Sequence, residues 1–220
     1  MDAAHDHCRA WWTLPAAGES VPRTRRDRRT LERDRCNELL ADARPRVGEP
    51  VSCTHSHGCA GIAVGPPGTR VGIDLERETD RDYVRLAELA YSPAESAWLR
   101  GLDATKRRQC FYRLWTLKEA FAKALGLDLA TALAQVRLEP VANGIVAVVP
   151  TDASWSAAVF SPHPGFRMAV VSVAASGVAR AVPIDFAGPP DTGHGPAHDL
   201  IWATGPCSRD RNHSSRESGP

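Results

Sequence analysis

Gly72-Ile73-Asp74-Leu75-Glu76 is a short run in which apolar and polar residues alternate. A period of two is typical of a β-strand with one buried face, so this run predicts a strand over residues 71–76. Side chains two residues apart point to the same face, which places the carboxylates of Asp74 and Glu76 side by side, about 7 Å apart at the backbone. Two carboxylates at this separation are close enough to share one cation.

A second run, Trp115-Thr116-Leu117-Lys118-Glu119-Ala120-Phe121-Ala122-Lys123, lies in the longest helical pattern of the chain, over residues 106–126. Apolar residues recur there at spacings of three and four, which predicts an amphipathic helix that ends at a glycine. Trp115, Glu119 and Lys123 are spaced by four and therefore share one face of this helix. The helix thus presents a carboxylate and an ammonium group together.

The two runs supply three carboxylates and two ammonium groups. The chain holds only three lysines, Lys106, Lys118 and Lys123, and two of them fall in the second run. Carboxylates without histidine suit a hard cation such as Mg²⁺, while lysine is a compact partner for phosphate. The pattern predicts a magnesium-dependent enzyme with a phosphorylated substrate. Taken singly, each run is also compatible with an exposed strand face or an i,i+4 salt bridge, but the two together favour a site.

Length and composition argue against several classes of protein. At 220 residues the chain is long enough for one good-sized domain or two small ones, and its hydrophobic content of 43% is ordinary for a globular protein. The formal net charge of +1 gives no general attraction to nucleic acid or membranes. No apolar run approaches the roughly 20 residues of a membrane span, and the N-terminus lacks the pattern of a signal peptide. We therefore expect a soluble, cytoplasmic protein.

The six cysteines are scattered along the chain. Cys53 and Cys59 lie close to His55 and His57, which suggests zinc, but the spacing is unlike that of paired zinc ligands. Reduced, mostly buried thiols are the better interpretation.

Residues 23–46 are rich in arginine and carry a weak stripe of leucines, which predicts a helix that ends before Pro45. Interspersed acids such as Asp27 and Glu32 favour a solvated helix, with a contribution to anion binding as the second interpretation. Nucleic-acid binding is least favoured, because the net charge is small and no aromatic residues are interleaved with these arginines.

Capping and turn signals define the remaining elements. Residues 82–102 form a helical pattern that is interrupted at Ser92-Pro93, where the serine can cap a second helix. An antiparallel meander is expected from four strand-like runs separated by turns: residues 136–139, 145–149, 155–160 and 166–173. Residues 187–220 are expected to be disordered, because they are rich in glycine, proline, serine and aspartate.

The two runs resemble the signature motifs of the 4'-phosphopantetheinyl transferases of the Sfp type. Further segments extend the resemblance over roughly residues 48–175: Thr54-His55-Ser56, Phe111-Tyr112-Arg113-Leu114 and Pro164-Gly165-Phe166-Arg167-Met168-Ala169-Val170. The resemblance implies an enzyme that moves the phosphopantetheine arm of coenzyme A to a serine of an apo acyl or peptidyl carrier protein. Adenosine 3',5'-bisphosphate would be released, with Mg²⁺ as cofactor.

The resemblance also implies roles for individual residues. Asp74, Glu76 and Glu119 would bind Mg²⁺, and Glu119 would be the general base, directly or through a metal-bound water. Contacts with coenzyme A are implied for six residues: Lys118 and Lys123 at its phosphates, Thr54 and His55 at its nucleotide end, and Arg25 and Arg29 as candidate N-terminal cations.

The fold implied by the resemblance is α+β, with antiparallel strands, a long motif-bearing helix, and two similar α/β halves (a pseudo-dimer) around a coenzyme A cleft. The halves would be residues 1–69, which are shorter than usual, and residues 70–178, in a monomeric protein. Gly48-Glu49-Pro50 stands where a basic residue is common, so one phosphate contact is expected to be missing. The alternative is therefore a non-catalytic relative that binds coenzyme A or a carrier. The type of carrier stays open, with a weak preference for secondary metabolism.

Overall fold

The computed structural model describes residues 7–15, 18–141, 144–174, 183–186 and 198–205. Within them the chain forms a mixed α/β structure with two four-stranded sheets. The first sheet has the order β2-β3-β1-β9 and consists of β1 (Cys8–Thr13), β2 (Val51–Ser56), β3 (Cys59–Val64) and β9 (Ile184–Phe186). The second has the order β10-β7-β8-β4 and consists of β4 (Arg70–Arg77), β7 (Trp155–Ser161), β8 (Phe166–Val173) and β10 (His198–Gly205).

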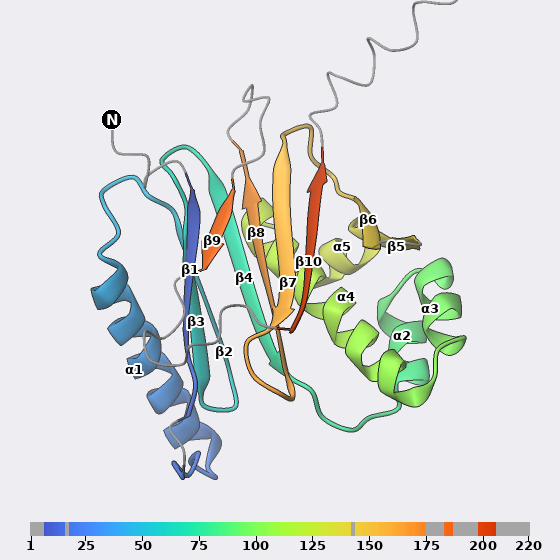
Figure 1. Cartoon of the computed structure of the whole chain (residues 1–220), viewed down its shortest axis with the longest axis horizontal. Helices are drawn as coiled ribbons and strands as arrows, with labels where there is room; N and C mark the ends of the chain where they lie inside the picture. Colours follow the sequence, from blue (N-terminus) through green and yellow to red (C-terminus); the bar gives the residue numbers. More distant parts are fainter. Residues whose placement is uncertain (1–6, 16–17, 142–143, 175–182, 187–197, 206–220) are drawn as a thin grey trace, which may run out of the picture.

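The helices of the described residues lie around these sheets. They are α1 (Arg25–Ala43), α2 (Tyr83–Ala90), α3 (Pro93–Arg100), α4 (Ala104–Leu125) and α5 (Leu129–Gln135). Figure 1 shows α1 at one end of the molecule and α2 and α3 at the other, with the strands between them. No helix in this described part is long and apolar enough to cross a membrane.

The same order of connection occurs in both sheets. In the first, β1 is followed by α1 and the β2–β3 hairpin, and β3 pairs antiparallel with β1. In the second, β4 is followed by helices, of which α4 packs on the sheet, and later by the β7–β8 hairpin, whose β8 pairs antiparallel with β4. The two sheets divide in the turn between β3 and β4, at residues 65–69.

Local capping signals set the helix ends as expected. Asp103 caps the start of α4 by accepting a hydrogen bond from the Lys106 N–H, and Gly126 ends this helix with φ at 68°. Between α2 and α3, Ser92 and Glu95 form a reciprocal capping box. The predicted long helix and the predicted break are both confirmed.

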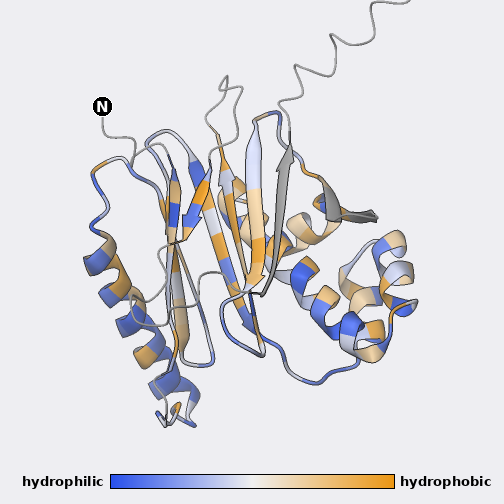
Figure 2. Cartoon of the chain, viewed as in Figure 1, coloured by the Kyte–Doolittle hydropathy of each residue, from blue (hydrophilic) through white to orange (hydrophobic). Residues whose placement is uncertain are grey.

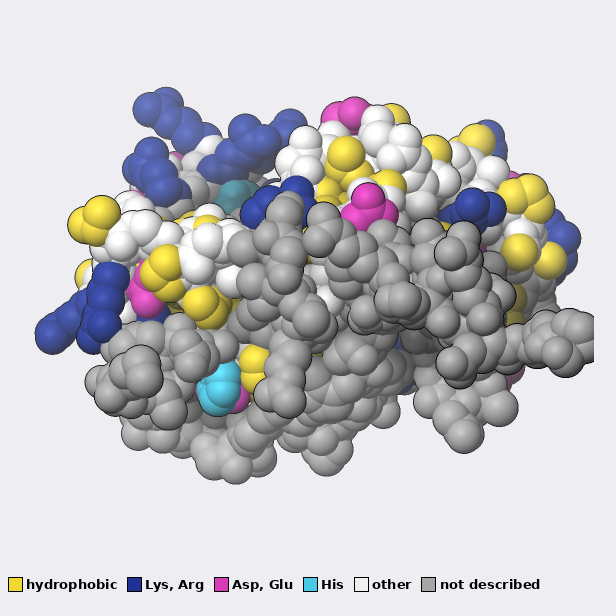
Figure 3. All heavy atoms as spheres, turned by 90° about the horizontal axis from the view of Figure 1, so that it is seen from above, with side chains coloured by type: hydrophobic (Ala, Val, Ile, Leu, Met, Phe, Trp, Pro, Cys, Tyr) yellow, Lys and Arg dark blue, Asp and Glu magenta, His cyan; other side chains and the backbone are white. Residues whose placement is uncertain are grey.

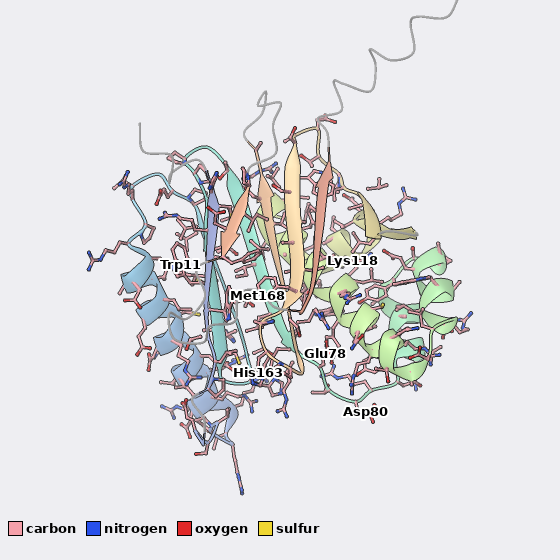
Figure 4. All side chains as sticks on the ribbon, viewed as in Figure 1. Trp11, Glu78, Asp80, Lys118, His163 and Met168 are labelled. Atoms are coloured by element: carbon pink, nitrogen blue, oxygen red, sulfur yellow. The ribbon has the colours of Figure 1, made fainter. Side chains whose placement is uncertain are left out.

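The alternation predicted for β4 is also confirmed. Val71, Ile73 and Leu75 lie in a core shared by both sheets. Met168 on β8, labelled in Figure 4, lies in the same core. Asp74 lies on the opposite face of the strand, toward α4. Figure 2 shows a similar division between whole elements, with α1 largely hydrophilic and β7 and β8 largely hydrophobic.

The structure corrects the expected meander. The hairpin of β5 (Arg137–Val141) and β6 (Gly144–Val148) forms a two-stranded sheet of its own, and the β7–β8 hairpin belongs to the second sheet. The expected disorder of residues 187–220 is wrong at β10, which pairs antiparallel with β7. The other residues of that tail lie outside the described residues.

Strand β1 was not predicted from the sequence. Cys8, Ala10 and Trp12 face the core shared by the sheets, while Trp11, labelled in Figure 4, packs with the small cluster beneath α1. Burial alternates along β1, but Trp11 on its half-buried face interrupts the alternation of apolar and polar residues by which strands are recognised.

Candidate active site

Gly72 allows α4 to lie directly on β4. A Cβ atom at this position would stand 1.9 Å from the carbonyl oxygen of Ala120 and 2.8 Å from the amide nitrogen of Ala124, both on α4. Only a residue without a side chain fits between a strand and a helix at this spacing. The close approach brings the face of α4 that carries Glu119 and Lys123 to the polar face of β4.

Asp74 is the most deeply buried acid of this face, with 4% of its surface exposed. Its Oδ1 accepts hydrogen bonds from Lys123 Nζ at 3.0 Å and from Thr54 Oγ1 at 3.3 Å. Lys123 Nζ also donates to the carbonyl oxygen of Ile73 at 2.7 Å. The second carboxylate oxygen of Asp74, Oδ2, is buried and has no hydrogen-bond partner among the described residues. A buried acceptor of this kind is suited to an added ligand.

All three acids of the site have raised pKa values. Burial is the main cause and raises the pKa of Asp74, Glu76 and Glu119, the last to about 7. The Asp74 carboxylate further raises the pKa of Glu76 and Glu119, whereas Lys123 lowers the pKa of all three acids. The site therefore holds more negative charge than one lysine balances.

The donor set suits Mg²⁺ in kind, because it consists of carboxylate oxygens. One observation supports the fit: Oδ2 of Asp74 is buried and has no hydrogen-bond partner among the described residues. Within the described residues, however, no three or more His, Cys, Asp or Glu side chains already stand as a metal-binding group. The acids are close enough to influence one another but are not preassembled as a cage.

Thr54 is buried and contacts Asp74, and its expected contact with coenzyme A stays a prediction. Its buried hydroxyl accepts a hydrogen bond from the Leu75 N–H at 3.1 Å and donates to Asp74. Ser56 acts in the same way on Glu76, donating to Oε2 at 3.2 Å. Sequence reasoning gave Ser56 no role, although it belongs to the Thr54-His55-Ser56 segment.

Lys118 does not reach a phosphate site, which corrects an expectation. Its side chain is 0% exposed, and its Nζ lies 3.0 Å from a carboxylate oxygen of Glu95. The same Nζ donates to the carbonyl oxygens of Leu133 at 3.1 Å and Val136 at 2.6 Å. Figure 4 shows Lys118 enclosed among the helices. Because adjacent helical residues point about 100° apart, Lys118 faces inward while Glu119 faces β4.

His55 and the N-terminal arginines lie on the α1 side of the site. His55 is exposed, and its Nδ1 lies 3.0 Å from Oε2 of Glu32 on α1. Arg25 and Arg29 are exposed on the same helix. Their expected contacts with coenzyme A stay predictions.

Another group of cations was missed by sequence reasoning. Arg77 and Arg28 lie near His57 and, after burial, are the main causes that lower its pKa; Arg81 contributes further. Arg81 also lowers the pKa of Glu76. The signal was available for Arg77 and Arg81, since both follow the first motif closely in the sequence. Figure 3 shows Lys and Arg side chains gathered toward the α1 end of the molecule.

A cavity of about 250 Å³ borders Glu76. Its polar lining comes from Glu76 and Arg81, beside the Trp115 ring of α4. The rest is largely apolar and is formed by Leu86, Leu89, Ala90, Phe111, Tyr112 and Leu133. The site thus has an apolar chamber next to its charged centre.

Residues 70–171 match the sequence model of the 4'-phosphopantetheinyl transferase superfamily. This segment belongs to that superfamily. It extends from the start of β4 into β8 and includes both motif-bearing elements, β4 and α4. All four strands of the first sheet lie outside the matched segment.

Relatives within the superfamily match about half of the chain. The 4'-phosphopantetheinyl transferase HetI of Nostoc sp. is 34% identical over 116 residues, which are 52% of this chain and 44% of that protein. The 4'-phosphopantetheinyl transferase Sfp of Bacillus subtilis is 28% identical over 102 residues, which are 46% of this chain and 45% of that protein. The chain therefore spans less than half the length of these relatives.

A solved structure is also similar over part of the chain. It is a holo-(acyl-carrier-protein) synthase from Bacillus anthracis in complex with CoA (3',5'-ADP), at 16% identity and a TM-score of 0.40. The overlay covers 49% of this chain and 96% of that one.

Proposed function

We propose that this chain is a 4'-phosphopantetheinyl transferase, which moves the phosphopantetheine arm of coenzyme A to a serine of an apo acyl or peptidyl carrier protein. The observation that carries the proposal is the meeting of the two motifs across β4 and α4. There Lys123 contacts Asp74, and Glu119 lies close enough to both to have its pKa changed by them. The superfamily match of residues 70–171 supports the same activity.

The transfer requires one bond to form and one to break at phosphorus. The serine oxygen of the carrier bonds to the phosphorus atom that bears the pantetheine arm, and the bond from that phosphorus to the leaving adenosine 3',5'-bisphosphate breaks. The serine proton goes to a base, and the leaving group departs as an anion. The site therefore needs a proton acceptor and positive charge near the pyrophosphate.

Glu119 is the proposed proton acceptor. In the protein without a bound cation, burial raises the pKa of Glu119 to about 7, so much of its carboxylate is ionised near neutral pH. Its partial burial beside Asp74 and Glu76 is what raises this pKa. Glu119 would hold the serine oxygen in line and receive its proton.

Lys123 and a divalent cation are the proposed positive charges. Lys123 is 33% exposed at its side chain, so it can turn part of its hydrogen bonding to a phosphate oxygen. Asp74, Glu76 and Glu119 are the residues that would hold Mg²⁺, which when bound would offset charge on the pyrophosphate. The cationic group of Arg28, Arg77 and Arg81 and the exposed His55 would extend this attraction toward the nucleotide end.

We further propose that the repeated order of connection reflects two similar halves, with the division near residue 70 and coenzyme A bound between them. The hydrogen-bonded contact of β2 with β4 lies at this division. The apolar cavity beside Glu76 and Trp115 suits the pantetheine arm better than the charged nucleotide. A monomer acting on a carrier of fatty-acid, polyketide or peptide assembly is consistent with these features.

Intact-mass spectrometry of a carrier protein tests the proposal. The chain is incubated with coenzyme A, Mg²⁺ and an apo carrier, and the carrier is expected to gain the mass of phosphopantetheine. Asp74→Ala should lose this activity, because it removes the most buried acid of the site. An unchanged carrier mass across acyl and peptidyl carriers would contradict the proposed function, and an active Asp74→Ala variant would contradict the role of Asp74.

A further inference from the structure

Three hydroxyl groups join the two sheets along the edges of β2 and β4. The backbone N–H groups of Ile73, Leu75 and Arg77 on β4 donate hydrogen bonds to β2. Their acceptors, at 3.2, 3.1 and 3.2 Å, are the side-chain oxygens of Ser52, Thr54 and Ser56. Both strands stand at an edge of their sheet. The hydroxyls therefore take the place of a backbone ladder, and this set is called the hydroxyl seam.

The register of the hydroxyl seam places two of its members beside acids. Each of these two hydroxyls accepts from one residue of β4 and faces the side chain of the residue before it. Thr54 accepts from Leu75 and donates to Oδ1 of Asp74 at 3.3 Å. Ser56 accepts from Arg77 and donates to Oε2 of Glu76 at 3.2 Å.

Ser52 is the third member and has a different neighbour. It accepts from the Ile73 N–H, and the residue before Ile73 is Gly72, which has no side chain. The seam thus contains two hydroxyls that contact an acid and one whose register position offers none. A comparison of Ser52 with Thr54 and Ser56 therefore separates the effect of a hydroxyl on the acids from its effect on the contact between the two sheets.

The chemistry of a hydroxyl fixes the direction of these bonds. A serine or threonine hydroxyl has one proton to donate and two lone pairs that accept. A backbone N–H already occupies a lone pair of Thr54 and of Ser56, and a carboxylate oxygen lies within hydrogen-bond distance of each hydroxyl. The Ser56 hydroxyl also lies 3.2 Å from Nδ1 of His57. Because an ionised carboxylate can only accept, the hydroxyl is the donor in the contacts of Thr54 with Asp74 and of Ser56 with Glu76.

We propose that Thr54 and Ser56 are positioning residues, which hold the carboxylates of Asp74 and Glu76 in the orientation that binds a divalent cation. One oxygen of each acid is fixed by its hydroxyl, and in Asp74 this leaves the buried Oδ2 free to face an added ligand. The first sheet thus sets the geometry of acids carried by the second. This inference rests on the proposed function, because it concerns the acids assigned there to the cation.

Binding of Mn²⁺, followed by the electron paramagnetic resonance signal of the free ion, tests the proposal. The full chain is titrated in the presence of coenzyme A and without a carrier, so that no turnover occurs. Hydrogen bonds to metal-binding carboxylates typically change metal affinity by 10–100-fold, so Thr54→Val and Ser56→Ala should each weaken Mn²⁺ binding by about tenfold. Thr54→Ser keeps the hydroxyl and should bind as the wild type does.

Ser52→Ala is the matched control. It removes one bond of the hydroxyl seam without touching an acid, so it should lower the melting temperature but leave Mn²⁺ affinity unchanged. Circular dichroism verifies that each variant is folded, and Ser56→Ala carries the test if Thr54→Val does not fold. Wild-type affinity in both Thr54→Val and Ser56→Ala, or an equal loss in Ser52→Ala, would overturn the positioning role. Failure of the wild-type chain to bind Mn²⁺ would instead remove the metal assignment of the proposed function, and this inference with it.

Discussion

Lys123 Nζ lies 3.0 Å from Asp74 Oδ1 and joins the second motif to the first. The same ammonium group donates to the carbonyl oxygen of Ile73, so it is held to both the backbone and the side chain of β4. It is the cation that lowers the pKa of all three acids. The position of Lys123 therefore controls how much of the negative charge of the site is balanced before any ligand binds.

Lys123→Met should reduce kcat/KM for coenzyme A by at least about 100-fold, because the site loses a cation at the proposed phosphate position. The variant should also unfold more easily by about 1–2 kcal/mol, a value reduced for the partial exposure of Lys123. Steady-state kinetics and urea unfolding measure the two effects. Lys106→Met is the control, since Lys106 is exposed near the start of α4. Equal kinetics in the two variants would contradict the role of Lys123.

Glu119→Gln should stabilise the metal-free protein at pH 8 and leave its stability unchanged near pH 4. The folded state raises the pKa of Glu119 from 4.5 to about 7, so between these values it binds more protons than the unfolded state. The free energy of unfolding therefore falls as the pH rises through this window. Glutamine stays neutral, and after allowance for solvent screening the gain at pH 8 is about 1–2 kcal/mol.

Urea unfolding at several pH values, with a chelator present, measures this difference. The exposed Glu88 on α2 supplies the control, Glu88→Gln. A difference between wild type and Glu119→Gln that does not change with pH would show that Glu119 is not held in a destabilised ionised form.

Gly72→Ala should destabilise the chain by about 3 kcal/mol or more, because the new methyl group would overlap the backbone of α4 and force the helix from the sheet. Transfer activity should fall in the folded fraction as well, since Glu119 would move away from Asp74. Gly101→Ala is a suitable control: its Cβ would come no closer than 3.4 Å to a neighbouring atom, and its φ of −74° is allowed for alanine. Thermal unfolding of the two variants gives the comparison, and equal melting temperatures would refute the close approach.

Lys118→Met should cost about 3–5 kcal/mol of stability, because it leaves the buried carboxylate of Glu95 without its cation. The double variant Lys118→Met/Glu95→Gln should recover part of this loss. The KM for coenzyme A of the folded protein should stay within about twofold of wild type, because Lys118 faces away from the acids. A large increase in KM with unchanged stability would restore Lys118 as a phosphate contact.

The sequence was sufficient for the parts of the site that depend on periodicity. Alternation along residues 71–76 placed Asp74 and Glu76 on one face, and spacing by four placed Glu119 and Lys123 on another. The capping signals at Ser92 and Gly126 likewise placed the helix ends. These features are local, so a short run of residues determines them.

Long-range packing accounts for the expectations that were wrong. Lys118 and Glu119 are neighbours in one motif, but the burial of Lys118 depends on residues outside that motif, such as Glu95, 23 residues away. The contacts of Thr54 with Asp74 and Leu75, on β4 in the other sheet, were also not predicted from the sequence. β10 pairs with a strand that is distant in the sequence, and a polar composition hid it. Such pairings depend on tertiary context, which a single sequence does not display.

The most direct test of the proposed transferase activity compares a wild-type apo carrier with the same carrier in which the acceptor serine is replaced by alanine. Each is incubated with the chain, coenzyme A and Mg²⁺, and its intact mass is followed over time. The account predicts that the serine carrier gains one phosphopantetheine group, that the alanine carrier gains none, and that Glu119→Gln slows the gain strongly. A serine carrier whose mass never changes, or a gain that does not depend on Glu119, would contradict it.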